Sequence, residues 1–96
     1  MPDRKKLDEK DILSRIANLK NWQFLDGKLR KEFRFPDFVK AFGFMTGVAL
    51  LAESLNHHPN WSNVYNSVMI ELYTHDANGI TEYDFNMAER IDALVA

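Results

Sequence analysis

The chain has 96 residues, no cysteine and a formal net charge of −2, which allows one domain, residues 1–96, and excludes disulfides, thiol nucleophiles and zinc–thiolate sites. This charge balance argues against direct nucleic-acid binding, because neutralising phosphates requires a basic excess on one face. We expect a cytoplasmic protein that is not secreted and does not span a membrane, because charged residues interrupt the longest apolar run and no hydrophobic signal region follows the charged N-terminus.

The first predicted elements are a helix and a β-hairpin. Apolar residues recur at helical spacing over residues 7–19, and Asp8 is the predicted N-cap. Residues 22–25 and 29–35 are predicted strands, because Asp26-Gly27 between them best supplies the positive φ angles of a tight turn. We interpret the basic cluster of this hairpin as a solvated strand face; it consists of Lys28, Arg30, Lys31 and Arg34.

A long apolar helix follows, with Asp37 as its predicted cap and its end near Leu55. Its apolar arc covers more than half the circumference, which is more than one sheet can bury. We infer that one side packs on the sheet and the other on a second copy of the chain, giving a homodimer or homotetramer. Gly43 and Gly47 indicate close approach of a neighbouring backbone, although chance tolerance or packing within the chain explains them equally well.

Two more strands and a last helix complete the chain. Residues 63–65 and 68–73 are predicted strands around Asn66-Ser67. Thr81 and Asp84 resemble a capping pair ahead of a further helical pattern. The order helix-strand-strand-helix-strand-strand-helix predicts an α+β fold, in which paired antiparallel hairpins carry the helices on one face.

The histidines are the strongest functional signal. All three lie close together in the sequence, with His57 and His58 adjacent and His75 at the end of a predicted strand. An imidazole titrates near pH ~6.5 and can act as both acid and base near neutrality, so the cluster predicts proton-transfer chemistry. Strand alternation places His75 on the outward face, so the strand must twist or end near Thr74 for the three rings to meet.

A metal site is the weaker interpretation of this cluster. Adjacent histidines point different ways in a regular backbone, and the remaining ligands would have to be His75 with Glu53 or Asp76. A helix C-terminus, where cationic side chains are favourable, would explain one histidine but not three.

The residues around the histidines suggest a binding wall. Pro59 and Trp61 can form a rigid apolar surface for a flat heteroaromatic ligand, although Trp61 alone is more typical of core packing. Glu53 lies one helical turn before His57, where it could orient an imidazole or remain in water.

The chain resembles the pterin-4a-carbinolamine dehydratase family over nearly its whole length, because several segments occur in the order typical of that family. They are Phe42-Gly43-Phe44-Met45-Thr46, Asn56-His57-His58-Pro59-Asn60-Trp61, Asn63-Val64-Tyr65-Asn66, Thr74-His75 and Gly79. The resemblance implies a four-stranded antiparallel sheet with three helices on one side, assembled as dimers or tetramers. It also implies a lyase that removes water from 4a-hydroxytetrahydropterin to give quinonoid dihydropterin, recycling the pterin of aromatic amino acid hydroxylases. No metal or organic cofactor is expected, because the step is neither a redox reaction nor a hydrolysis.

By the same resemblance, the catalytic residues are His57, His58 and His75. We hypothesise that His57 and His75 share the acid and base roles and that His58 orients the substrate or compensates for a lost partner. The expected substrate contacts are Glu53, Asn56, Pro59, Trp61, Thr74, Asp76 and Ala77.

The sequence departs from vertebrate members at three positions. Asn56 replaces aspartate and Asp76 replaces glutamate, which keeps both positions polar, whereas Tyr83 replaces a basic residue. Vertebrate members also bind a dimeric homeodomain transcription factor, a role that this sequence does not indicate. The alternative hypothesis is a non-catalytic oligomeric module that docks a regulatory protein or a hydroxylase.

Overall fold

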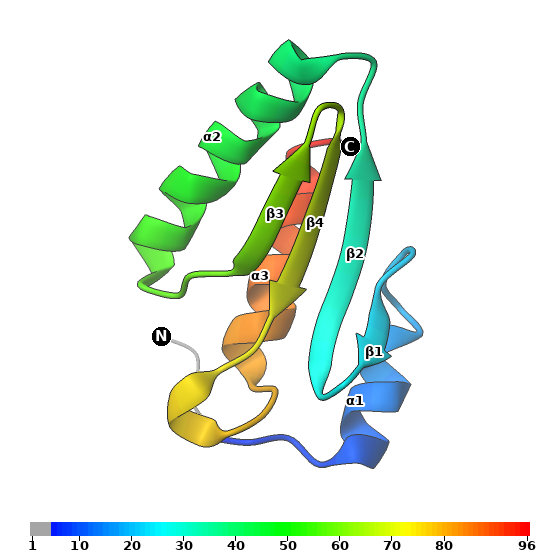
Figure 1. The fold of residues 1–96 in the computed structure, drawn as a ribbon. Helices are drawn as coiled ribbons and strands as arrows, with labels where there is room; N and C mark the ends of the chain where they lie inside the picture. The colour runs from blue at the N-terminus through cyan, green and yellow to red at the C-terminus, as the bar shows by residue number, and fades with distance from the viewer. Residues whose placement is uncertain (1–4) are drawn as a thin grey trace.

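The structure is a computed structural model that describes residues 5–96. Its helices and strands follow the predicted order (Figure 1). They are α1 (Glu9–Ile16), β1 (Gln23–Leu25), β2 (Lys28–Arg34), α2 (Phe38–Leu55), β3 (Asn60–Val64), β4 (Ser67–Leu72), the short 3-10 helix η1 (His75–Ala77) and α3 (Glu82–Ala93).

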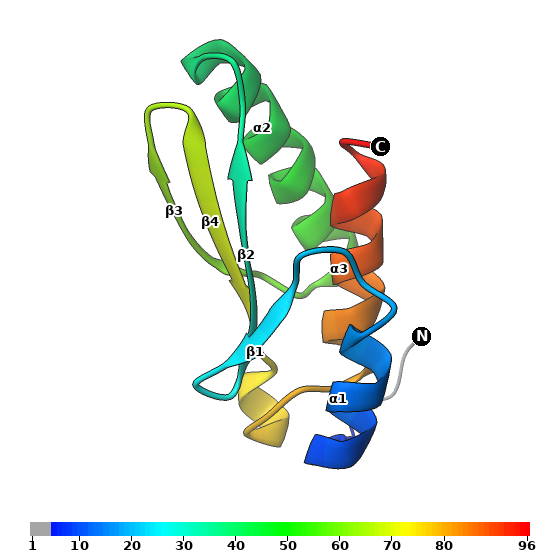
Figure 2. The same ribbon diagram turned by 90° about the vertical axis from the view of Figure 1, so that its right-hand side faces the viewer.

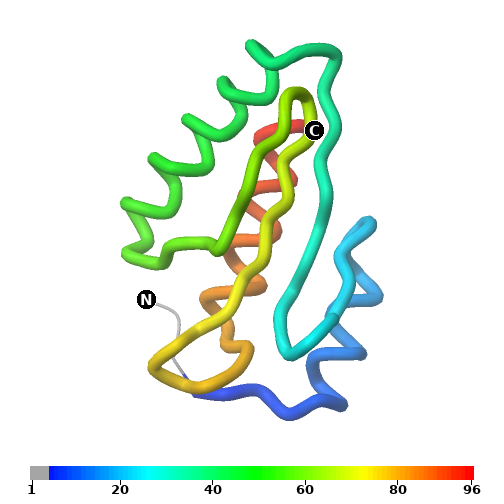
Figure 3. Tube along the Cα trace, in the orientation of Figure 1, coloured from blue at the N-terminus to red at the C-terminus, as the bar shows by residue number. Residues whose placement is uncertain are grey.

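The strands form one antiparallel sheet in the order β1-β2-β4-β3. Each hairpin pairs its own two strands, and β2 joins β4 in the middle of the sheet, where Lys31 faces Ile70 and Phe33 faces Val68. Helices α1, α2 and α3 all lie on one face of the sheet (Figure 2). The backbone trace shows the segment after α2 crossing directly into β3 (Figure 3). The predicted α+β fold is therefore confirmed.

The helix caps and the first hairpin, which were predicted from neighbouring residues in the sequence, are confirmed. Asp8 and Asp37 cap α1 and α2 by accepting backbone N–H groups, and Thr81 forms a capping box with Asp84 at the start of α3. The Asp26-Gly27 turn has φ angles of 52° and 76°, as the predicted hairpin requires.

The second hairpin differs from the prediction by several residues. β3 begins at Asn60 rather than at residue 63, and the turn falls on Tyr65-Asn66. The amide of Asn63 donates to the carbonyls of Tyr65 and Ser67, which stabilises a turn in which Tyr65 has a φ of 50°. Side-chain support of this kind lets an aromatic residue occupy a position that usually favours glycine or asparagine.

Helix α2 packs on the sheet with only one of its faces. Its buried residues are small or apolar and lie at helical spacing, and by length and composition α2 is the one helix in the described chain apolar enough to cross a membrane. The opposite face is open within one chain, where Phe42 is 55% and Leu50 is 69% exposed. A side chain at Gly43 would meet nothing within 4 Å and one at Gly47 would meet only Leu94, so neither glycine is explained by a close backbone within the described chain.

Lys31 corrects the interpretation of the basic cluster as a solvated face. Its side chain points to the helix side of the sheet and is only 12% exposed. Asp92 of α3 accepts from Lys31 Nζ at 2.8 Å and from the indole N–H of Trp22 at 3.0 Å. The ammonium also lies 4.6 Å from the ring centre of Phe33. A long-range carboxylate and aromatic rings thus make burial of this lysine favourable.

Replacing Asp92 with alanine should lower the free energy of unfolding by about 1–3 kcal/mol, because a nearly buried ammonium and an indole N–H lose their acceptor. Urea unfolding of wild-type and variant proteins measures this change. Glu89→Ala on the same helix removes an exposed carboxylate and should change stability by less than about 0.5 kcal/mol. Equal losses in the two variants would contradict the proposed stabilising role of Asp92.

Candidate active site

The end of α2 separates the two adjacent histidines. Asn56 has φ 51° and ψ 44°, and the N–H of His57 donates back to the carbonyl of Ala52 at 3.0 Å. Asparagine tolerates this left-handed conformation, and the backbone hydrogen bond closes the helix. His57 then turns inward and is 5% exposed, whereas His58 stays on the surface. The adjacent rings therefore have different surroundings.

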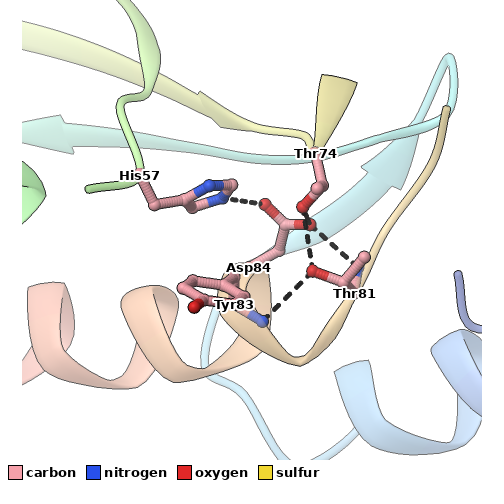
Figure 4. Close-up of polar contacts among 5 residues, drawn as sticks. All are labelled: His57, Thr74, Thr81, Tyr83 and Asp84. Carbon is pink, nitrogen blue, oxygen red and sulfur yellow. Dashed lines mark hydrogen bonds and ion pairs between the residues drawn. The ribbon is translucent and has the colours of Figure 1, made fainter. Parts of the chain in front are cut away.

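A buried carboxylate holds His57 (Figure 4). His57 Nε2 lies 2.6 Å from Asp84 Oδ1. The other oxygen, Asp84 Oδ2, accepts from Thr74 Oγ1 at 2.7 Å and from the backbone N–H of Thr81 at 2.9 Å. Thr74, Thr81 and Asp84 are each at most 1% exposed, so these contacts are made away from water. They tie the end of β4 to the start of α3.

The number of protons on each group fixes the direction of these hydrogen bonds. Thr74 Oγ1 uses its single proton on Asp84, so Thr81 Oγ1 must donate in their 2.9 Å contact. Thr81 Oγ1 in turn accepts from the N–H of Tyr83 at 3.2 Å. Asp84 Oδ2 accepts from both threonines, which leaves Oδ1 to His57; because a carboxyl is a stronger acid than an imidazolium, we assign the proton between Oδ1 and His57 to Nε2.

This assignment fixes which ring nitrogen of His57 carries the lone pair. With the proton on Nε2, a neutral imidazole has its acceptor lone pair on Nδ1. Any proton exchange with a bound molecule then goes through Nδ1 while Nε2 stays bonded to Asp84. The carboxylate orients the ring and compensates the positive charge that forms when Nδ1 takes up a proton.

His58 has a weaker and more solvated partner. Its Nε2 lies 3.0 Å from Glu53 Oε1, and the two side chains are 59% and 82% exposed. Exposed pairs of this type contribute little to stability. Glu53 can therefore bias the orientation of His58 without fixing it.

His75 reaches the site because β4 ends before it. The last residue of β4 is Leu72, and the N–H of Thr74 donates to the carbonyl of Gly79 at 3.0 Å in an isolated bridge. The chain then forms η1, whose first residue is His75. This confirms the requirement that the strand end near Thr74, since alternation no longer dictates the direction of His75.

The three imidazoles line one small cavity of about 190 Å³. It lies between the end of α2 and η1. Its lining residues are Asn56, His57, His58, Tyr73, His75 and Asp76. Two of the predicted substrate contacts, Asn56 and Asp76, are thus brought to the same cavity as the histidines.

The remaining predicted contacts lie outside this lining. Thr74 is buried against the Asp84 carboxylate, and Glu53 lies beside the cavity against His58. Trp61 pairs with Ile70 and packs against the hydrophobic core on the helix side of the sheet. The predicted contacts that do not line the cavity in this structure are Glu53, Pro59, Trp61, Thr74 and Ala77.

Two residues of the site were not predicted from the sequence, Asp84 and Tyr73. Asp84 had a sufficient local explanation as a helix cap. A signal for a second role was nevertheless present, because Asp84, Ala88 and Ile91 follow the i, i+4, i+7 spacing of a buried helix face. A carboxylate on such a face needs a buried partner. For Tyr73, no sequence signal distinguished it from an ordinary strand residue.

The fold is a small α+β structure with three histidines around one cavity, and within residues 5–96 no group of three or more His, Cys, Asp or Glu side chains is arranged to hold a metal ion. The sequence pattern of the family described as Pterin 4 alpha carbinolamine dehydratase matches residues 5–94. The chain therefore belongs to this family.

Individual relatives agree in fold and sequence. A protein of Solibacter usitatus, provisionally named a pterin-4-alpha-carbinolamine dehydratase, is 53% identical over 91 residues, covering 95% of this chain and 96% of its own. A crystal structure of a transcriptional coactivator/pterin dehydratase from Brucella melitensis matches with a TM-score of 0.91 and 42% identity, covering 96% of this chain and all of that one. A pterin dehydratase-like protein described as a RuBisCO assembly factor of the alpha-carboxysome matches with a TM-score of 0.67 and 26% identity, over 81% and 90% of the two chains.

Proposed function

We propose that this protein is a dehydratase that removes water from 4a-hydroxytetrahydropterin to give quinonoid dihydropterin. The observation that carries the proposal is the shared cavity: a buried, carboxylate-held imidazole and two exposed imidazoles face one space. The product would be reduced again for use by aromatic amino acid hydroxylases. We place the reaction in the cytoplasm, and a hydroxylase is a candidate partner.

The reaction needs an acid and a base on the same substrate. An acid protonates the hydroxyl on C4a, the C–O bond breaks as water leaves, and the ring nitrogen lone pairs supply the electrons for the new double bond. A base removes the ring proton. Each well-placed proton transfer is typically worth ~10²- to 10⁴-fold in rate.

The geometry favours a division of roles between the two ends of the cavity. His57 is the base through Nδ1, because Asp84 holds its Nε2 proton and can compensate the positive charge. His75, on the opposite wall, is the acid that protonates the leaving hydroxyl. His58 orients the substrate from the rim, where Glu53 biases its ring.

A stopped-flow assay with freshly generated 4a-hydroxytetrahydropterin tests the function directly. The wild-type protein should accelerate the appearance of quinonoid dihydropterin well above the uncatalysed rate. A folded protein that leaves the uncatalysed rate unchanged would contradict the proposed activity.

A non-catalytic docking role is the second candidate, because α2 presents an apolar face and one relative is described as an assembly factor. In either case we propose that this face first binds a second copy of the chain. An apolar helix face of this extent is unfavourable on a soluble monomer.

Light scattering at micromolar concentration should therefore give the mass of a dimer or a tetramer. Leu50→Glu, at a 69% exposed position on the open face of α2, should shift the mass towards the monomer because it places a charge in the interface. Leu13→Glu, at a 53% exposed position on α1, is the matched control and should leave the mass unchanged. A monomeric wild-type protein would exclude self-association through this face.

A further inference from the structure

His75 is held differently from the other two histidines. His57 and His58 each have a carboxylate partner, whereas the His75 imidazole makes no hydrogen bond or ion pair within residues 5–96. Its ring contact is with Tyr73, whose centre lies 5.1 Å away at an interplanar angle of 80°. Edge-to-face pairs at this separation are attractive because the positive edge of one ring meets the negative face of the other.

The backbone around Tyr73 is anchored on both sides. Tyr73 directly follows Leu72, the last residue of β4, which is fully buried. It directly precedes Thr74, whose backbone pairs with Gly79 and whose hydroxyl is bonded to Asp84. The peptide units on both sides of Tyr73 are therefore held, so the bond from which its ring projects has a fixed position.

The ring of Tyr73 also forms part of the border between two cavities. It lines the histidine cavity and a larger one of about 580 Å³, which extends past Ile80 and Phe24 towards α1. No other residue lines both cavities within the described chain. Tyr73 is half-buried at this border, so its ring has fewer accessible rotamers than a surface tyrosine.

We propose that Tyr73 is the positioning residue for His75, and this rests on the dehydratase function proposed above. The tyrosine ring keeps the His75 imidazole in the side-chain rotamer that faces the cavity, and its hydroxyl has no part in the contact. An exposed histidine without this support would distribute among several staggered rotamers, of which only one presents the acid to the substrate.

Two variants and two measurements test the proposal. Tyr73→Leu keeps an apolar side chain but removes the ring, and it should lower kcat by about 3- to 10-fold with KM within about twofold of wild type. Tyr73→Phe keeps the ring and should match wild type in both parameters.

In NMR spectra, three-bond couplings across χ1 of His75 should report one rotamer in wild type and in Tyr73→Phe, and rotamer averaging in Tyr73→Leu. A His75→Gln variant assigns the resonance among the three histidines.

Each outcome decides a different point. A single His75 rotamer in Tyr73→Leu, or an equal loss of kcat in Tyr73→Phe, would overturn the positioning role. A rise in KM with unchanged kcat in Tyr73→Leu would also overturn it, because Tyr73 would then be a substrate-binding wall. A wild-type protein without dehydratase activity would remove the proposed function, whereas the coupling constants would still show whether Tyr73 orders His75.

Discussion

His57→Gln should abolish most of the dehydratase activity while the protein stays folded. The glutamine amide can reach the region of His57 Nε2 and donate to Asp84 Oδ1, so the buried carboxylate keeps a partner. Glutamine has no basic nitrogen in place of Nδ1, and we expect the rate of dehydration to fall by about 10²- to 10⁴-fold. Stopped-flow assays measure the rate, and circular dichroism with urea unfolding establishes that the fold persists.

His57→Ala separates the structural effect from the chemical one. It leaves Asp84 Oδ1 buried without its imidazole donor, which costs about 1–3 kcal/mol of stability in addition to the lost activity. His75→Ala should also lose activity, with little effect on stability, because His75 is exposed. Near-normal rates in both His57→Gln and His75→Ala would exclude the proposed acid and base pair.

Features encoded by neighbouring residues could be predicted from the sequence. The Asp26-Gly27 turn and the caps at Asp8, Asp37 and Thr81 depend on side chains within three or four positions of the backbone that they serve. The turn of the second hairpin was predicted at the wrong residues. Its position depends on hydrogen bonds from the side-chain amide of Asn63, which lies before the turn and is not part of the usual turn pattern.

Features that depend on distant residues were missed or misassigned. Lys31 was interpreted as solvated, since its partner Asp92 lies 61 positions later in the chain. Asp84 lies 27 positions after His57, and only the packing of α3 beside the end of α2 brings them together. Trp61 was expected beside the histidines from proximity in sequence; strand alternation in β3 turns it towards the core, and its contact with substrate stays a prediction.

The same contrast applies within the site. The convergence of the three histidines could be proposed from the sequence because family resemblance identified them, and the structure brings them to one cavity. The distinct surroundings of the three rings could not be predicted from the sequence. They arise from the left-handed conformation of Asn56, from the end of β4 and from the hydrogen bond between Thr74 and Thr81. These differences provide the physical basis for assigning different roles to similar side chains.

Asp84→Asn should remove the proposed dehydratase activity by reversing a single hydrogen bond. The N–H of Thr81 and the hydroxyl of Thr74 both donate to Oδ2, so the amide oxygen of asparagine must occupy that position. Its NH₂ group then faces His57 Nε2 and donates to it, which moves the imidazole proton to Nδ1. The base nitrogen becomes a donor, and we expect a fall in rate of about 10²- to 10⁴-fold with the fold preserved.

Nitrogen chemical shifts of the His57 ring test this mechanism independently of activity. In wild type they should report a proton on Nε2, and in Asp84→Asn a proton on Nδ1. Thr74→Val is the control, because it removes one donor to Asp84 but leaves the carboxylate facing His57. It should keep the wild-type tautomer and lose about 1–2 kcal/mol of stability rather than activity. An Asp84→Asn protein with the wild-type tautomer and rate would show that the carboxylate does not set the proton position, and the role of His57 as base would then lose its structural support.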